Sequence, residues 1–241
     1  MAKQAQNPIA NLISVPFQNN TTFDYGPRHR TQNIFNIQPV LPFTLNEDWN
    51  LITRWILPIV HQPSLARGDS SDTGTGNLNP TLFLSTSVAK DVLVGFGPTF
   101  LLPTASSNEL GTKKWGAGPS AVAVWTPGHW LVGTLVNNIW SFAGPDRNQS
   151  TVNQFLAQPF INYNLSDGWY LTSAPIITAN WEADRSADTW TVPVGGGFGK
   201  LSRIDPLPPI NAELQVFRLA EAPRHGGTWA LRTQVQFLFP K

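Results

Sequence analysis

The chain has 241 residues and a formal net charge of +1, and only 13% of its residues are charged, where a soluble globular protein carries about 25%. It has no cysteine, which excludes disulfide frameworks, thiolate metal sites and cysteine nucleophiles. The near-neutral charge argues against a nucleic-acid-binding protein, and no apolar run approaches the roughly 20 residues of a membrane-spanning helix. Ten tryptophans and fourteen phenylalanines therefore need another explanation.

Residues 1–10 are predicted to form a polar N-terminal segment. In it, Met1-Ala2-Lys3-Gln4 is polar and leads directly into Asn7-Pro8-Ile9. A basic stretch followed by an apolar core, which marks a signal peptide, is absent. We interpret the chain as a mature exported protein whose signal peptide is missing from this sequence, with a cytosolic protein as the alternative. Whether residues 10–17 begin the first strand or fold partly inside is left open.

Apolar and polar residues alternate with period two along most of the chain, as they do in strands with one apolar face. In residues 229–239, for example, Leu231 and Val235 share one face and Arg232 and Gln234 the other. Prolines recur too often for helices of average length. The pattern predicts about twelve strands, at 11–23, 31–43, 49–60, 77–86, 91–103, 114–125, 129–142, 152–164, 169–181, 189–200, 210–220 and 228–239.

The connections between these strands alternate in length. Residues 182–188 form a long polar connection, whereas residues 126–128 form a tight turn. An up-and-down antiparallel sheet with two unlike ends produces this alternation. We therefore predict an all-β fold, a single domain over 1–241 built as an antiparallel β-barrel. Six prolines at 39, 80, 98, 119, 159 and 175 fall at mid-strand on the apolar face, and the pattern gives no reason for them.

Two features favour a transmembrane barrel over a soluble β-sandwich or ligand-holding barrel. The polar faces carry mainly Asn, Gln, Thr and Ser with few charges, which fits an enclosed interior and a lipid-facing apolar band. Tryptophans gather at strand ends, as in the aromatic girdles at the two membrane interfaces. The predicted girdle residues are Trp49, Trp115, Trp125, Trp130, Trp140, Trp169, Trp181, Trp190 and Trp229.

Several hairpins resemble those of an uncharacterised Gram-negative outer-membrane family. These hairpins are residues 45–54, 95–103, 118–124, 161–169 and 234–241. Members of the family are described as transporters or porins, are likened to outer-membrane proteins of meta-pathway phenol degradation, and sometimes carry a mistaken neuromedin U label. The resemblance implies an outer-membrane location, with both termini and the tight turns in the periplasm and the long loops outside. It assigns no functional residues.

The polar face of the strands supplies the candidate site. Its side chains would line the lumen and form a polar, nearly neutral path for small solutes, or would hydrogen-bond across a plugged interior; the sequence leaves both open. The candidate lumen residues are Asn36, Gln38, Arg54, Gln154, Gln158, Asn162, Asn180, Glu213, Gln215, Arg232, Gln234 and Gln236.

Other motifs carry weaker signals. Residues 195–200 are rich in glycine but lack phosphate-loop spacing, so we expect a strand whose glycines make room for larger side chains. The four histidines lack metal-ligand spacing, and Asp69 and Asp72 lack the order of a calcium loop. No serine stands in a nucleophile motif. We expect no enzyme activity, no metal and no cofactor.

The predicted function is therefore an outer-membrane channel for passive passage of small solutes. The family resemblance alone suggests aromatic or apolar solutes. The alternatives are a closed barrel with a structural or surface-binding role and a soluble ligand-binding β protein. Expected partners are the lipid bilayer and lipopolysaccharide, which Arg28, His29 and Arg30 of the first loop could contact, and a homo-oligomer is possible.

Overall fold

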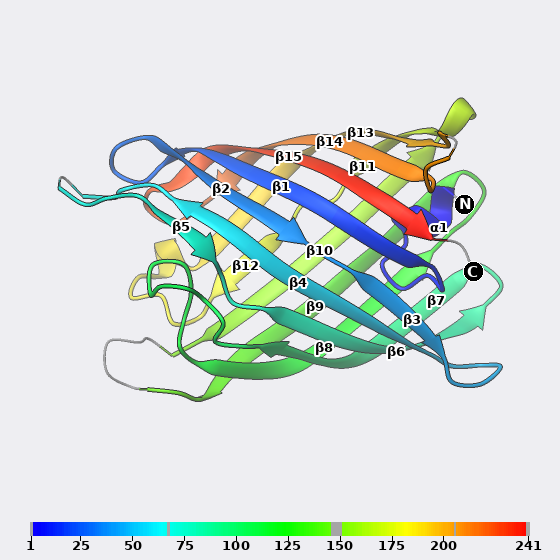
Figure 1. The fold of residues 1–241 in the computed structure, drawn as a ribbon, viewed down its shortest axis with the longest axis horizontal. Coiled ribbons are helices and arrows are strands. Elements are labelled where there is room, and N and C mark those ends of the chain that lie inside the picture. The colour runs from blue at the N-terminus through cyan, green and yellow to red at the C-terminus, as the bar shows by residue number, and fades with distance from the viewer. Residues whose placement is uncertain (1, 67, 146–150, 205, 240–241) are drawn as a thin grey trace.

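The chain folds into one closed antiparallel β-barrel in the computed structural model, which describes residues 2–66, 68–145, 151–204 and 206–239 (Figure 1). The strands are β1 (Ile13–Tyr25), β2 (Arg30–Ile37), β3 (Val40–Thr44), β4 (Asn50–Gln62), β5 (Asp72–Thr75), β6 (Asn79–Ala89), β7 (Val92–Leu101), β8 (Trp115–Trp125), β9 (Trp130–Ala143), β10 (Asn153–Asn164), β11 (Trp169–Ser173), β12 (Ile177–Asn180), β13 (Trp190–Ser202), β14 (Ile210–Glu221) and β15 (Gly226–Phe239). A short helix α1 (Ala2–Gln6) precedes them, and two 3-10 turns, η1 (Ser166–Gly168) and η2 (Ser186–Asp188), lie between strands.

These segments make twelve staves. Strands β2 and β3 lie end to end between β1 and β4, and β11 and β12 lie end to end between β10 and β13. Strand β5 only extends the edge of β4. Pairing of β1 with β15, from Ile13 opposite Phe239 to Tyr25 opposite Gly226, closes the barrel. The predicted all-β barrel of twelve strands is confirmed, with boundaries within a few residues for most strands.

The two ends of the barrel differ. The tight-turn end carries the connections β3–β4, β6–β7, β8–β9, β10–β11 and β13–β14, and the loop end carries β1–β2, β4–β6 with β5 inside it, β7–β8, β9–β10, β12–β13 and β14–β15. Strand β1 begins, strand β15 ends and helix α1 lies at the tight-turn end (Figure 1). The predicted alternation of short and long connections holds in part, because the β1–β2 and β14–β15 connections at the loop end have four residues each and the β13–β14 connection at the tight-turn end has seven. Among the described residues, no helix is long and apolar enough to cross a membrane.

Four of the six mid-strand prolines lie at or directly beside interruptions of the hydrogen-bond ladder. Pro39 separates β2 from β3, and Pro175 lies between β11 and β12. Pro98 and Pro119 face each other across β7 and β8. In the pairing of β7 with β6, the register omits the pairs between Thr81 and Leu84 of β6. In the pairing of β8 with β9, it omits the pairs between positions 117 and 120 of β8. Because proline cannot donate to the ladder, the ladder is broken at these positions.

Side chains at alternate positions of the staves point into the barrel, and near the tight-turn end many of those on β3, β4, β6, β8, β9 and β10 are apolar. A buried apolar cluster joins inward residues of five staves and of β3 to the N-terminal segment. Its members are Ile9, Val40, Ile52, Phe83, Val122, Val124, Leu131, Leu135 and Phe160. The sequence predicted a mostly polar inner face, and this cluster is an apolar part of that face.

Candidate functional site

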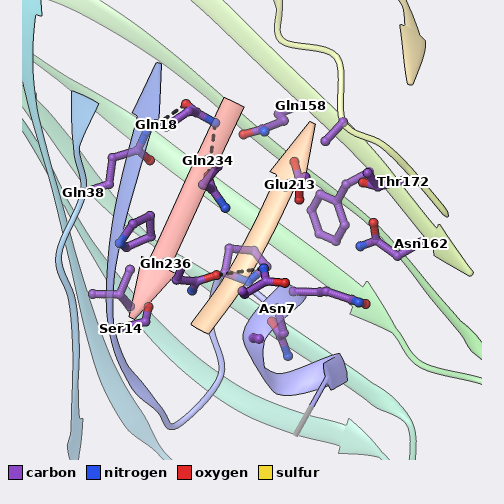
Figure 2. A pocket seen from close by; sticks show the side chains of 18 of the residues that line it. Asn7, Ser14, Gln18, Gln38, Gln158, Asn162, Thr172, Glu213, Gln234 and Gln236 are labelled. Atoms are coloured by element: carbon purple, nitrogen blue, oxygen red, sulfur yellow. Dashed lines mark hydrogen bonds between the residues drawn. The ribbon is translucent and has the colours of Figure 1, made fainter. Parts of the chain in front are cut away.

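The inner face of the barrel holds two cavities on opposite sides of one arginine. The chamber, of ≈ 130 Å³, lies toward the tight-turn end and is lined by polar side chains of β1, β10, β14 and β15 together with Arg54 and residues 5–8 (Figure 2). The vestibule, of ≈ 680 Å³, lies toward the loop end and has a mostly apolar lining. Among the described residues, Arg232 alone lines both.

The structure places the predicted lumen residues as follows. Eight of them line the chamber, namely Gln38, Arg54, Gln158, Asn162, Glu213, Arg232, Gln234 and Gln236. Asn36 lines the vestibule. Gln154 and Asn180 face each other on paired strands, and Gln215 is buried and accepts a hydrogen bond from the backbone N–H of Ala174. Their part in solute passage stays a prediction.

A chain of side-chain hydrogen bonds crosses one wall of the chamber. The guanidinium of Arg54 donates from Nη2 to Oε1 of Gln38 over 2.9 Å, and Gln38 donates to Gln18 over 2.9 Å. Gln18 then donates to Gln234 over 3.3 Å (Figure 2). Because amide side chains carry both donors and acceptors, they link β1, β4, β15 and the break between β2 and β3 without introducing further charge. This network holds the Arg54 guanidinium in place.

The adjoining wall, on β14, is organised around Glu213, which is the register partner of Gln234. Its carboxylate accepts a hydrogen bond from the side-chain amide of Gln215 and lies 3.2 Å from the hydroxyl of Tyr170. The same hydroxyl donates to Oδ1 of Asn211 over 2.9 Å, and Nδ2 of Asn211 donates to Oε1 of Gln236 over 3.2 Å. Among described lining residues, Glu213 is the single carboxylate of the chamber.

Arg232 is held rigidly at the boundary between the cavities. Its Nε donates to Oδ1 of Asn20 over 2.9 Å, and its Nη1 donates to the carbonyl oxygen of Ala174 over 2.6 Å. The guanidinium also lies 5.1 Å from the centre of the Phe217 ring, within cation–π range. The residue is 6% exposed. Its position is therefore fixed by three strands and by the break between β11 and β12.

The N-terminal segment, residues 2–12, folds into the tight-turn end of the lumen. Ile9 is 1% exposed within the apolar cluster, and its Cδ1 lies close to Gly95 of β7. Lys3 donates to the carbonyl of Thr126 over 2.7 Å, and Gln6 donates to Asn164 over 2.9 Å. The N-terminal segment is therefore packed inside the barrel, and residues 2–12 are called the plug below.

A sequence signal for this packed segment lies in strand β8, whose two faces are both apolar. In β8, the inward Val122 and Val124 follow outward Ala121 and Ala123, so both faces of the strand are apolar. A strand that is apolar on both faces must be buried on both faces. An apolar partner inside the barrel was therefore predictable, although its identity as Ile9 was not.

The predicted girdle tryptophans lie at or near the ends of the staves. Eight of the nine are more than a third exposed, namely Trp115, Trp125, Trp130, Trp140, Trp169, Trp181, Trp190 and Trp229, while Trp49 is half-buried and packs edge-to-face on Phe96. Trp55, at mid-strand, is also exposed. Their contact with a membrane interface stays a prediction.

The weaker motifs have structural roles. Residues 195–200 lie within β13, and a Cβ at Gly199 would fall 2.2 Å from the Tyr170 ring, so this glycine does make room for a larger side chain. Asp72 accepts a hydrogen bond from Ser107, and Asp69 accepts one from the backbone of Ala66. Within the described ranges, no group of three or more metal-ligating side chains occurs.

Comparison with known proteins supports the fold. No family model matches the chain, and no curated protein sequence matches it. Among solved structures, an outer-membrane channel from Pseudomonas putida F1 aligns over 97% of both chains with 18% identity and a TM-score of 0.71. The NanC porin aligns over 95% of this chain and 100% of its own, with 10% identity and a TM-score of 0.58. The CymD monoaromatic hydrocarbon channel aligns over 100% and 91%, with 9% identity and a TM-score of 0.52. The chain has the fold of bacterial outer-membrane channels.

Proposed function

We propose that this protein is a channel of the bacterial outer membrane that passes small solutes passively. The observation that carries the proposal is the arrangement of two cavities inside the closed barrel, one above and one below the fixed Arg232. A barrel of about eight strands is filled by its side chains and one of about sixteen leaves an open channel, so twelve staves provide an intermediate lumen. The fold shared with outer-membrane channels supports the same function.

The surroundings of the barrel support a membrane location. The outward positions are apolar and the exposed tryptophans mark both rims, so the lipid bilayer is the partner that this surface would contact. Lipopolysaccharide and a second copy of the chain remain proposed partners. Of the residues suggested for lipopolysaccharide, Arg28 donates to Ser64 of the neighbouring loop over 3.1 Å, so it also has a structural role.

The solute class also has support in the lining. The vestibule is walled by Ile34, Leu65, Ile176 and Leu219, among others, which favours solutes with an apolar part. The similar fold of CymD, described as a monoaromatic hydrocarbon channel, agrees with this. An aromatic solute of small size is therefore the form of the proposal to be tested.

Planar-bilayer recording of the purified, folded protein tests the channel function. We expect discrete current steps, and we expect the protein to require detergent for monodispersity and to show heat-modifiable mobility in gels. Absence of current steps from protein that passes the mobility test would overturn the proposal. A monodisperse protein in buffer without detergent would favour a soluble β protein instead.

A closed barrel with a structural or surface-binding role is the second candidate, and the packed N-terminal segment favours it. Residues 5–8 line the chamber and Ile9 fills the apolar cluster beneath it. If the segment never leaves, solutes cannot pass. Current recordings from folded variants that weaken the packing of Ile9 separate the two candidates. A closed barrel gives no current in these variants, whereas a channel blocked by the segment gives more current than the wild-type protein.

A further inference from the structure

The vestibule combines an apolar wall with a positively charged floor. Ile34, Ile176, Pro193 and Leu219 line its sides, and the guanidinium of Arg232 closes its base beside the Phe217 ring. Its volume of ≈ 680 Å³ falls within the range of about 300–1,000 Å³ typical of small-molecule sites. Such sites are mostly apolar with a few fixed polar groups that orient the ligand. The vestibule has this composition.

The charges along the lumen are unbalanced. Arg54 and Arg232 line the chamber with the single carboxylate of Glu213, and Arg224 lines the vestibule, where the described lining includes no carboxylate. Among the described lining residues, the two cavities together therefore carry three guanidinium groups and one carboxylate; Asp188, outside this lining, accepts a hydrogen bond from the backbone N–H of Arg224. Rings of arginine favour anions in pores. A neutral apolar solute would make no ion pair with these guanidinium groups.

Arg232 also has donor capacity left. Its Nε and Nη1 are used by Asn20 and by the carbonyl of Ala174, whereas its Nη2 donates to none of the described groups. A guanidinium has five N–H donors in a planar fork that suits a carboxylate. Because two of its nitrogens are already anchored, the group needs little further ordering to receive a ligand, which lowers the entropic cost of binding.

We infer that the lumen binds an organic anion with an apolar body, of the aromatic carboxylate class. The carboxylate is received by Arg232 at the base of the vestibule, and the apolar body lies against Phe217, Ile176 and Leu219. From there the anion passes to the chamber, where Arg54 is the next positive group. The inference rests on the proposed channel function in taking this anion to be a transported solute, and it names the class of that solute.

Binding can be measured independently of conduction. Fluorine NMR of 4-fluorobenzoate added to the folded protein in detergent reports binding whether or not the barrel is open. The neutral isostere 4-fluorobenzamide tests the need for charge, and an excess of acetate tests the need for the apolar body. We expect 4-fluorobenzoate to bind at least about tenfold more tightly than 4-fluorobenzamide, and we expect benzoate but not acetate to displace it. Equal binding of the two probes, binding of neither, or displacement by acetate at the same concentration would overturn the inference.

Variants locate the site. Arg232→Gln keeps a polar side chain but removes the charge, and we expect it to weaken 4-fluorobenzoate binding at least about tenfold while leaving 4-fluorobenzamide unchanged. Arg232→Lys keeps the charge and is expected to retain the preference for the anion. The matched control is Arg218→Gln, because Arg218 is exposed on the outer face and lies over Trp229. Unchanged affinity in folded Arg232→Gln protein would contradict the inference, and the comparison of probes on the wild-type protein remains decisive if that variant does not fold.

Conduction supplies the second arm. If the wild-type protein binds 4-fluorobenzoate selectively but gives no current, the proposed channel function fails while the site stands. If it conducts and shows no preference for 4-fluorobenzoate in binding or for anions in reversal potential, the site fails while the channel stands. Failure of the channel function and failure of the anion site therefore give different combinations of binding and conductance results.

Discussion

Replacing Ile9 by alanine is the most direct test of whether the N-terminal segment controls passage. Ile9 is 1% exposed and packs in the apolar cluster with Phe83 and Val122. Truncation of a buried isoleucine to alanine costs about 2–5 kcal/mol. If that energy holds the segment in the lumen, the ratio of docked to undocked segment falls about thirtyfold to several thousandfold, since about 1.4 kcal/mol corresponds to a factor of ten.

The expected outcome is a higher open probability in single-channel recordings of Ile9→Ala than of the wild-type protein. The barrel itself should keep its heat-modifiable mobility, because Ile9 lies outside the strand ladder. Ile204→Ala is the matched control, since Ile204 is 53% exposed in a connection at the tight-turn end.

The position of the N-terminal segment can be measured separately by thiol labelling, because the chain contains no cysteine of its own. Ala5 is buried, so the single thiol of an Ala5→Cys variant should react slowly with a polar thiol reagent and faster when Ile9→Ala is added. An unchanged reaction rate together with unchanged open probability, in folded protein, would refute the idea that Ile9 holds the segment in place.

Three further predictions concern stability, membrane position and the outer loops. Gly199→Ala should lower the temperature at which gel mobility shifts, because the added Cβ would fall 2.2 Å from the Tyr170 ring. Lipids brominated near the headgroup should quench tryptophan fluorescence more than lipids brominated near the chain ends; the reverse order would contradict the girdles. The backbone N–H of Arg224 holds the pKa of Asp188 below its ordinary value of 3.8, so this contact is present above pH 3.8 and is lost as the pH falls through the lowered pKa. The amide proton shift of Arg224 should follow that titration in the wild-type protein and not in Asp188→Asn.

Much of the fold was predictable because a barrel repeats one simple rule. Period-two alternation and the spacing of turns located twelve staves, and the strand containing Arg232 and Gln234 was assigned to the correct faces. The interruptions were less predictable. Pro39 and Pro175 marked them, but the sequence does not say whether a strand bends, bulges or divides at a proline. That choice depends on which neighbouring strand can lose a hydrogen bond.

The contents of the lumen were predictable only in part. Alternation tells which side chains point inward, but it does not tell which of them meet across the barrel. The pairing of Arg54 with Gln38, and the anchoring of Arg232 by the carbonyl of Ala174, require the register of distant strands and the break after β11. Packing of Ile9 inside likewise depends on contacts more than forty positions away in sequence, with Ile52 and Phe83.

The low charge of the chain has a consequence for the few charges that remain inside. In a lumen lined mainly by amides, Arg54 and Arg232 are held by neutral acceptors, and Glu213 is the one carboxylate among the residues described as lining the chamber. A buried charge is costly unless it is paired, so the extra guanidinium favours entry of an anion from solution. The apolar plug beneath the chamber and the positive floor of the vestibule then act in series. The plug determines whether a path exists, and the arginines determine which solutes enter it.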